Sequence, residues 1–235
     1  EEAGHEAFAE SCRQMGLPVR IGRWRIPGRP RCILVGFSSL YSEKNGILAG
    51  LWERHGVDSI AGDWDYVEPV LFATAAAKVI ERWWEEYLAP FHRRAVVQAH
   101  EWMTGASLLY LRERIPSVGT VFTTHATMLG RALASLGIDP SQGLGDKKAE
   151  DLAQQHGVRA KHSLEGACAR KADVFATVSA ITAAEAELLH GRKATVLQPN
   201  GIDLAVVDHL AGTDRAAMRT KVARFASAFL RSEEH

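Results

Sequence analysis

The chain has 235 residues, and its 28 basic and 28 acidic side chains give a formal net charge of zero. Apolar residues make up 46% and charged residues 24% of the sequence, which is ordinary for a globular protein with one large domain or one domain and an extension. The charge balance gives no reason to expect a nucleic-acid partner, and no apolar run approaches the ~20 residues of a membrane span.

The three cysteines, Cys12, Cys32 and Cys168, are odd in number and widely spaced. This pattern fits free thiols in a reducing compartment better than a disulfide framework or a metal-binding knuckle. No signal peptide opens the sequence. We therefore expect a cytoplasmic protein that contains no metal site and needs no cofactor.

The N-terminal part of the chain is predicted to contain a helix and two strands. Residues 1–16 carry apolar side chains at helical spacing and end near a glycine. Residues 17–26 alternate apolar side chains with arginines, as an edge strand does, and residues 27–30 form a turn rich in Pro and Gly. The continuous apolar run at residues 32–37 is typical of a strand that is covered on both faces.

Two helices are expected next, and the first spans residues 42–55. Its apolar face is expected to contain Ile47, Leu48, Leu51 and Trp52. The second helix runs to Leu88, and Asp65 could cap its start. Because this helix is apolar around much of its circumference, we expect it to lie deep against the sheet, with Trp83 and Trp84 in packing rather than sugar contacts.

The centre of the chain predicts a β-α-β unit. Residues 95–99 and 118–123 are short apolar runs rich in Val and Thr, a helical pattern joins them at residues 102–114, and each run ends at a histidine. Parallel strands need such a crossover, and ligands of open α/β sheets bind beyond the carboxyl ends of the strands. The first residues to suspect are therefore His100, Glu101 and His125.

The C-terminal part continues the alternation of helices and strands. After a loop at residues 136–145, the expected elements are helices at 146–156 and 161–171, a strand at 173–179, a helix at 181–190 with Ser179 as its candidate cap, and a strand at 194–197. The tail at 203–235 is expected to be an amphipathic helical stretch whose apolar side contains Met218, Val222, Phe225, Phe229 and Leu230. This alternation predicts a Rossmann-like, doubly wound and mostly parallel α/β sheet. We expect one domain at residues 1–203 and a helical extension or linker at residues 204–235.

Four successive strands are predicted to end in polar residues. These ends are His100-Glu101, Thr123-Thr124-His125, Thr177-Val178-Ser179 and Pro199-Asn200-Gly201. A single histidine after a strand is as often structural as functional. Because parallel strands place all their carboxyl ends on one side of the sheet, the four sets together predict a shared crevice.

The spacing of these residues excludes several chemistries. The His-Glu pair at 100–101 would need a second histidine at position 104 to form a zinc-protease helix, and Thr104 is there. The sequence has no Gly-x-Ser-x-Gly elbow, Gly-x-Gly-x-x-Gly turn or Walker loop. The remaining His, Glu, Thr and Asn side chains suit hydrogen bonding to a polyhydroxylated ligand.

Several of these segments resemble the eukaryotic-type glycogen synthases. The similar segments are Gly22-Arg-Trp-Arg-Ile, His100-Glu-Trp-Met-Thr-Gly, Phe122-Thr-Thr-His-Ala-Thr-Met-Leu-Gly-Arg, Ala172 to Glu187 and Gln198-Pro-Asn-Gly-Ile. They occur in the family's order and cover roughly residues 20–203. The ten-residue block that begins at Phe122 is highly specific.

The resemblance implies one domain of a retaining glycosyltransferase of the GT-B fold, in which two Rossmann-like domains face each other. Such an enzyme transfers glucose from UDP-glucose or ADP-glucose to an α-1,4-glucan. The resemblance implies that His125 and Glu101 lie beside the donor glucose as the catalytic pair. Further substrate contacts are expected at His100, Thr124, Ser179, Asn200 and Gly201.

Two departures from the family pattern shape this expectation. The family's first strand and Gly-rich loop have no counterpart before Gly22, and its second Rossmann domain has none after residue 203. We expect an incomplete N-terminal, acceptor-side domain that is inactive alone and pairs with a C-terminal Rossmann domain, and an oligomer is compatible with this expectation. Two alternatives stay open: a sucrose- or trehalose-synthase-type GT-B enzyme, and a non-catalytic glycan-binding module.

Overall fold

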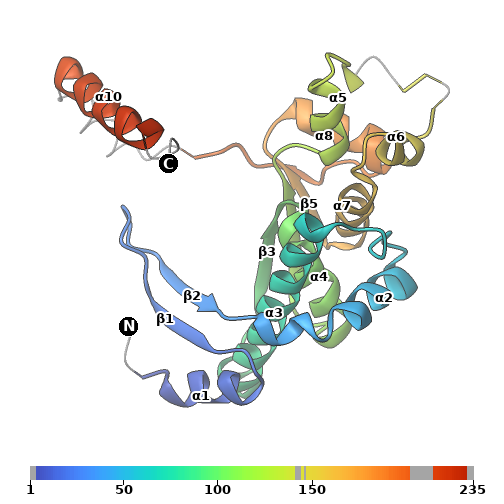
Figure 1. Cartoon of the computed structure of the whole chain (residues 1–235). Coiled ribbons are helices and arrows are strands. Elements are labelled where there is room, and N and C mark those ends of the chain that lie inside the picture. Colours follow the sequence, from blue (N-terminus) through green and yellow to red (C-terminus); the bar gives the residue numbers. More distant parts are fainter. Residues whose placement is uncertain (1–3, 141–143, 146, 202–213, 232–235) are drawn as a thin grey trace. The chain divides into compact units, whose positions relative to one another are not determined.

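The computed structural model describes residues 4–140, 144–145, 147–201 and 214–231, with side chains described as far as residue 227. The chain divides into two compact units, Glu1–Pro199 and Asn200–His235. Figure 1 shows the elements of each unit. Unit 1 contains the strands and most of the helices, and unit 2 contains one described helix.

Unit 1 contains two sheets. The strands are β1 (Val19–Arg23), β2 (Arg31–Val35), β3 (Val96–His100), β4 (Gly119–Thr124), β5 (Val174–Thr177) and β6 (Val196–Leu197). The strands β3 to β6 pair in parallel and in chain order, so each connection between neighbours contains at least one helix. The predicted parallel α/β architecture is confirmed, and it is consistent with a Rossmann-like domain.

Unit 1 also contains the helices that connect these strands and precede them. They are α1 (Glu6–Gln14), η1 (Ser38–Tyr41), α2 (Lys44–His55), α3 (Trp64–Tyr87), η2 (Ala89–Phe91), α4 (Glu101–Arg114), α5 (Met128–Ala134), α6 (Ala149–Gln155), α7 (Arg159–Lys171) and α8 (Ala180–His190). Helix α4 connects β3 to β4 and packs against both strands, and α3 and α7 pack against α4 (Figure 1). Phe122 of β4 and Phe175 of β5 are fully buried and lie beside each other in register, so the core lies between this sheet and its helices.

The strand predicted at residues 32–37 is not covered on both faces. It forms β2, which pairs only with β1 in an antiparallel two-stranded sheet. The exposed fraction is 36% for Ile33 and 52% for Leu34. The turn at residues 27–30 closes a hairpin, and a hairpin that lies outside the parallel sheet is not covered by crossover helices on both faces.

Two details predicted for the helices are wrong. Trp52 was expected on the apolar face of α2 but is 55% exposed, whereas Leu48 and Leu51 are buried as predicted. Asp65 does not cap α3, because the N-cap position is occupied by Asp63 and the Asp65 carboxylate pairs with Lys161.

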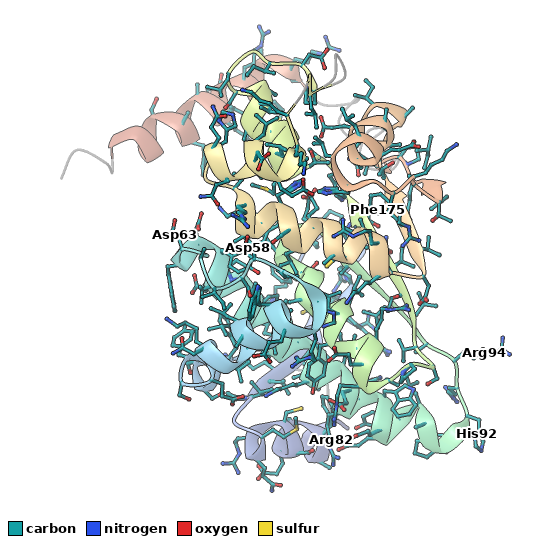
Figure 2. All side chains as sticks on the ribbon, turned by 90° about the vertical axis from the view of Figure 1, so that its right-hand side faces the viewer. Asp58, Asp63, Arg82, His92, Arg94 and Phe175 are labelled. Carbon is teal, nitrogen blue, oxygen red and sulfur yellow. The ribbon has the colours of Figure 1, made fainter. Side chains whose placement is uncertain are left out.

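Trp83 takes part in packing, as predicted. Its ring lies 5.1 Å from the ring of Phe8 and 4.5 Å from the ring of Tyr87. The contact with Phe8 joins α3 to α1. Arg82, which is labelled in Figure 2, adds a hydrogen bond of 2.5 Å from its Nε to Ser11 Oγ of α1. The N-terminal helix is therefore attached to α3 by an aromatic cluster and a polar contact.

Unit 2 contains α10 (Arg215–Arg231). Met218 and Val222, which were predicted on its apolar side, are 37% and 65% exposed. The predicted positions Phe229 and Leu230 lie outside the described side chains, as do residues 202–213. Among the described helices of the chain, none combines the length and the hydropathy needed to cross a membrane.

Candidate functional site

The carboxyl ends of the parallel strands meet at one edge of the sheet, as predicted. His100 is the last residue of β3 and lies in register with Thr123 of β4. Thr124 is the last residue of β4 and lies in register with Thr177 of β5. The residues that follow these three strands therefore begin within one region.

His100 and His125 form a hydrogen-bonded pair in this region. His100 Nδ1 lies 3.0 Å from His125 Nε2, and the two ring centroids are 5.3 Å apart. One of the two nitrogens must carry the proton, so the neutral pair keeps one further donor and one further acceptor for a ligand. Partial burial, together with the nearby His125, lowers the pKa of His100 below its ordinary value, which favours the neutral ring.

Glu101 holds the backbone of His125. Its Oε1 accepts a hydrogen bond of 2.7 Å from the backbone N–H of His125. Glu101 has a φ of +63°, a left-handed conformation that is unusual for a residue other than glycine. The backbone turns sharply here from β3 into α4, and Thr104 Oγ1 donates a hydrogen bond of 2.6 Å to the His100 carbonyl. The structure thus brings His100, Glu101 and His125 together.

Ser179 lies at the start of α8 beside the same group. Its hydroxyl accepts a hydrogen bond of 3.1 Å from Thr182 N–H, so the predicted cap is confirmed. Thr182 Oγ1 in turn donates a hydrogen bond of 3.3 Å to the carbonyl of His125. The backbone of His125 is therefore tied at its N–H to α4 and at its carbonyl to α8.

The other predicted substrate contacts are placed differently. Thr124 is fully buried, and its hydroxyl donates a hydrogen bond of 3.0 Å to Glu165 Oε1. The side chain of Thr124 is thus directed into the core of unit 1 and away from the histidine pair. Asn200 and Gly201 belong to unit 2, so their role as substrate contacts stays a prediction.

The sequence is similar to proteins of known name. The family described as glycogen synthase matches residues 2–226. The chain belongs to the glycogen synthase family. It is 33% identical to the glycogen [starch] synthase of Neurospora crassa over 200 residues, which are 85% of this chain and 28% of the relative.

Two further relatives agree with this assignment. The chain is 34% identical to glycogen [starch] synthase isoform 2 of Saccharomyces cerevisiae over 85% of its own length and 29% of the relative. It is 32% identical to the liver glycogen [starch] synthase of Mus musculus over 83% of its own length and 27% of the relative. The chain thus spans little more than a quarter of the length of these glycogen synthases.

The segment of this glycogen synthase family member that begins at His100 also has a packing role. Trp102 is 94% removed from solvent, stacks on Tyr66 at 5.8 Å and has the Lys161 ammonium 5.4 Å above its ring. A Cβ atom added to Gly105 would lie 2.5 Å from Cys168 Sγ. The tryptophan and the glycine of this motif therefore fix how closely α4 approaches α3 and α7.

The structure also brings together three residues that were not predicted to form one group. His162 and Glu165 of α7 lie beside His190 at the end of α8, and ligand atoms from the three lie within 4.8 Å of one another. The sequence signal for this group was the His-x-x-Glu pattern of His162 and Glu165 in a predicted helix, because residues three apart lie on the same helix face. Its partner His190 is 25 residues further along the chain and could be found only from the fold.

Proposed function

We propose that this chain is the acceptor-side, N-terminal domain of a retaining glycosyltransferase that transfers glucose from UDP-glucose or ADP-glucose to an α-1,4-glucan. Membership of the glycogen synthase family supports the reaction class. The observation that carries the proposal is the histidine pair, in which His125 is held at the end of β4 through both its N–H and its carbonyl. A residue fixed in this way can meet a sugar without reorganising.

The chemistry of the pair suits a retaining transfer. Such a transfer builds positive charge on the glucose ring, and groups that hydrogen-bond more strongly to the transition state lower its free energy. We propose that His125 hydrogen-bonds the hydroxyls of the donor glucose, with His100 as the second member of the pair. Neither imidazole needs to take a proton for this role, in agreement with the lowered pKa of His100.

Glu101 has a positioning role in this proposal. The family resemblance implies that Glu101 lies beside the sugar as a catalytic residue, and in the structure its carboxylate oxygen accepts the His125 N–H at 2.7 Å. We therefore assign to Glu101 the task of fixing the main chain of His125.

The proposal further includes a second Rossmann-like domain that contributes the other half of the donor site. The chain alone is then not expected to transfer glucose. We also propose a cytoplasmic location, which the three free cysteines support.

The test of the proposed function uses a protein that contains this chain together with a second Rossmann-like domain. Labelled UDP-glucose or ADP-glucose is supplied with glycogen, and the label in the polymer is measured. His125→Ala should lower kcat by on the order of a hundredfold or more, the loss typical of one transition-state hydrogen bond. The melting temperature should change little, because the backbone bonds of His125 remain in the variant.

Two variants of Glu101 separate positioning from charge. Glu101→Gln keeps an oxygen that can accept the His125 N–H, whereas Glu101→Ala removes it. If Glu101 acts by positioning, the Gln variant should keep most of the activity and the Ala variant should lose it. Equal losses in both would show that the charge itself is needed.

The acceptor decides between the family reaction and its alternatives. Transfer to a small sugar in preference to glycogen would indicate the sucrose- or trehalose-synthase type of enzyme. Glucan binding without any transfer would indicate a glycan-binding module. A His125→Ala variant with unchanged kcat would remove the histidine pair from the site.

A further inference from the structure

A buried group of two imidazoles and one carboxylate lies apart from the histidine pair described above. It consists of His162, Glu165 and His190, whose exposed fractions are 4%, 0% and 4%. The rings of His162 and His190 are 4.8 Å apart, and His190 Nε2 lies 3.0 Å from Glu165 Oε2. Three ionisable side chains that are almost completely removed from water need partners that repay their desolvation.

The hydrogen bonds of the described residues leave this group incompletely satisfied. Nδ1 of His162 and Nδ1 of His190 are both buried and have no hydrogen-bond partner among them. Buried nitrogens are rarely left in this condition, because each loses its bonds to water without replacement. An electron-pair acceptor bound in the group would supply the missing interaction.

The donor set points to a particular class of ion. Two imidazole nitrogens and one carboxylate oxygen are the protein ligands of many zinc sites, in which the fourth position stays open. Calcium and magnesium prefer oxygen ligands throughout, so they fit this group poorly.

The three side chains would need to approach one another only slightly to bind a metal ion. Ligand atoms around a tetrahedral zinc ion lie ~3.4 Å apart, given metal–ligand distances of ~2.0–2.1 Å. The ligand atoms of the three residues already lie within 4.8 Å of one another. To bind such an ion, the ligand atoms would therefore have to approach one another by at most ~1.4 Å.

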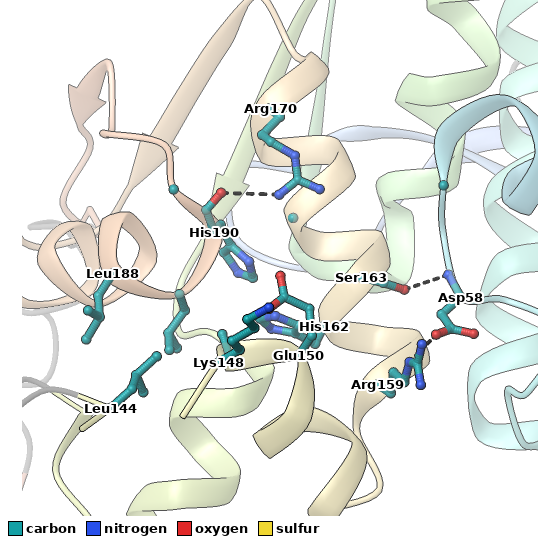
Figure 3. Close-up of a pocket in the computed structure, with 15 residues that line it drawn as sticks. Asp58, Leu144, Lys148, Glu150, Arg159, His162, Ser163, Arg170, Leu188 and His190 are labelled. Atoms are coloured by element: carbon teal, nitrogen blue, oxygen red, sulfur yellow. Dashed lines mark hydrogen bonds and ion pairs between the residues drawn. The ribbon is translucent and has the colours of Figure 1, made fainter. Parts of the chain in front are cut away.

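A cavity gives access to the group. It has a volume of about 480 Å³, and both His162 and His190 form part of its wall (Figure 3). Figure 3 also shows Arg170 donating to the His190 carbonyl, a hydrogen bond of 3.2 Å that fixes the end of α8 against α7. The wall contains none of the residues predicted for sugar binding, so the cavity is separate from the histidine pair.

We propose that His162, Glu165 and His190 bind one divalent transition-metal ion of the zinc type, with its open coordination position facing this cavity. Glu165 also accepts hydrogen bonds from Thr124 Oγ1 at 3.0 Å and from Met128 N–H at 3.0 Å. The ion would therefore tie α7 and α8 to the segment that follows β4. This inference does not depend on the proposed transferase activity. It revises the expectation that the chain contains no metal site, because that expectation rested only on the residues at the strand ends and on the cysteines.

The first experiment measures binding to the chain itself. The chain is freed of metal with a chelator, dialysed against zinc and analysed for its metal content, and its affinity is measured by competition with a zinc indicator. One zinc per chain is expected. Saturation with free zinc at a hundred times the dissociation constant should raise the melting temperature by ~5–10 °C.

Ligand variants and a matched control locate the ion. His162→Gln and His190→Gln should each weaken binding by at least ~100-fold, because loss of even an outer-shell partner weakens metal sites by ~10–100-fold. His92→Asn removes one imidazole from an exposed position with a φ of +51°, which asparagine tolerates, and should leave the affinity unchanged. Equal affinity in all four proteins would overturn the proposal.

A second measurement on the unaltered chain avoids the possibility that a variant fails to fold. X-ray absorption of the zinc-loaded chain should show only nitrogen and oxygen neighbours at ~2.0–2.2 Å, with the scattering pattern of two imidazoles. A sulfur shell at ~2.3 Å would place the ion on a cysteine and refute the assignment. Failure of the chain to retain any zinc would refute it as well.

Discussion

The close contact between α4 and α7 makes a quantitative prediction for Gly105. An added Cβ would lie 2.5 Å from Cys168 Sγ, about 1 Å closer than the ~3.5 Å at which non-bonded atoms pack. Cys168 is fully buried, so its sulfur has no solvent-filled space into which to move. Gly105→Ala should therefore cost ~1–3 kcal/mol through overpacking, against a gain of up to ~1 kcal/mol in helix propensity.

A control substitution isolates the packing cost. Gly46 also lies in a helix, and a Cβ atom added there would meet nothing within 4 Å. Gly46→Ala should thus stabilise the chain by up to ~1 kcal/mol through helix propensity alone. Urea unfolding followed by circular dichroism gives both free energies, and Gly105→Ala should be the less stable of the two by ~1–3 kcal/mol.

Cys168→Ala provides the decisive background for Gly105→Ala. It removes the sulfur, and the nearest remaining atom is the Cβ of residue 168 at 3.6 Å, an ordinary contact. Gly105→Ala should then cost little, which corresponds to a coupling energy of ~1–3 kcal/mol between the two sites. A penalty that persists without the sulfur would refute the explanation. Equal stabilisation by Gly105→Ala and Gly46→Ala would show that the helices are not in close contact at all.

Two further predictions concern polar contacts near the sheet. The hydrogen bond from Arg112, with further bonds from Thr120, holds the pKa of Asp173 below its ordinary value of 3.8. The ionised Asp173 carboxylate therefore stabilises the fold fully above pH ~4, and this stabilisation is lost as the pH falls through the lowered pKa. Asp173→Asn should accordingly show a shallower loss of the urea midpoint below pH 4 than the unaltered chain, and parallel curves would contradict this. The Thr127 hydroxyl caps α5 by accepting the Gly130 N–H at 3.0 Å. Thr127→Ala should lower the free energy of unfolding in urea by ~1–2 kcal/mol, whereas Thr127→Ser, which keeps a hydroxyl, should lower it less. Equal losses of stability in the two variants would rule out the cap.

The sequence was sufficient for the centre of the fold. The two Val- and Thr-rich runs and the helix between them appear within about one residue of their predicted ends, as β3, α4 and β4. These three elements could be predicted because their signals are local, namely short apolar runs, a helical period and an abrupt polar end. The convergence of His100 with His125 then followed from the parallel arrangement alone.

Other features depended on contacts that the sequence does not display. The apolar run in β2 looks the same whether a helix covers it or not, so the exposure of Leu34 could not be foreseen. The Thr124 hydroxyl donates to Glu165, which lies 41 residues away in the chain, so the buried position of Thr124 could not be read from its own neighbours. The grouping of His162 with His190 similarly depends on how α7 and α8 pack.

The histidine pair and the buried group of His162, Glu165 and His190 are linked through the end of β4 and the residues that follow it. The backbone of His125 is held by Glu101 on one side and by Thr182 on the other. One residue earlier, the Thr124 hydroxyl is bound to Glu165, whose carboxylate also bonds to His190. The side chains of successive residues thus go to different places: His125 towards His100, and Thr124 towards the buried group. A substitution of Glu165 that removes its hydrogen bond to Thr124 should therefore shift His125, although Glu165 itself makes no described contact with that histidine, because Thr124 and His125 are adjacent in the chain.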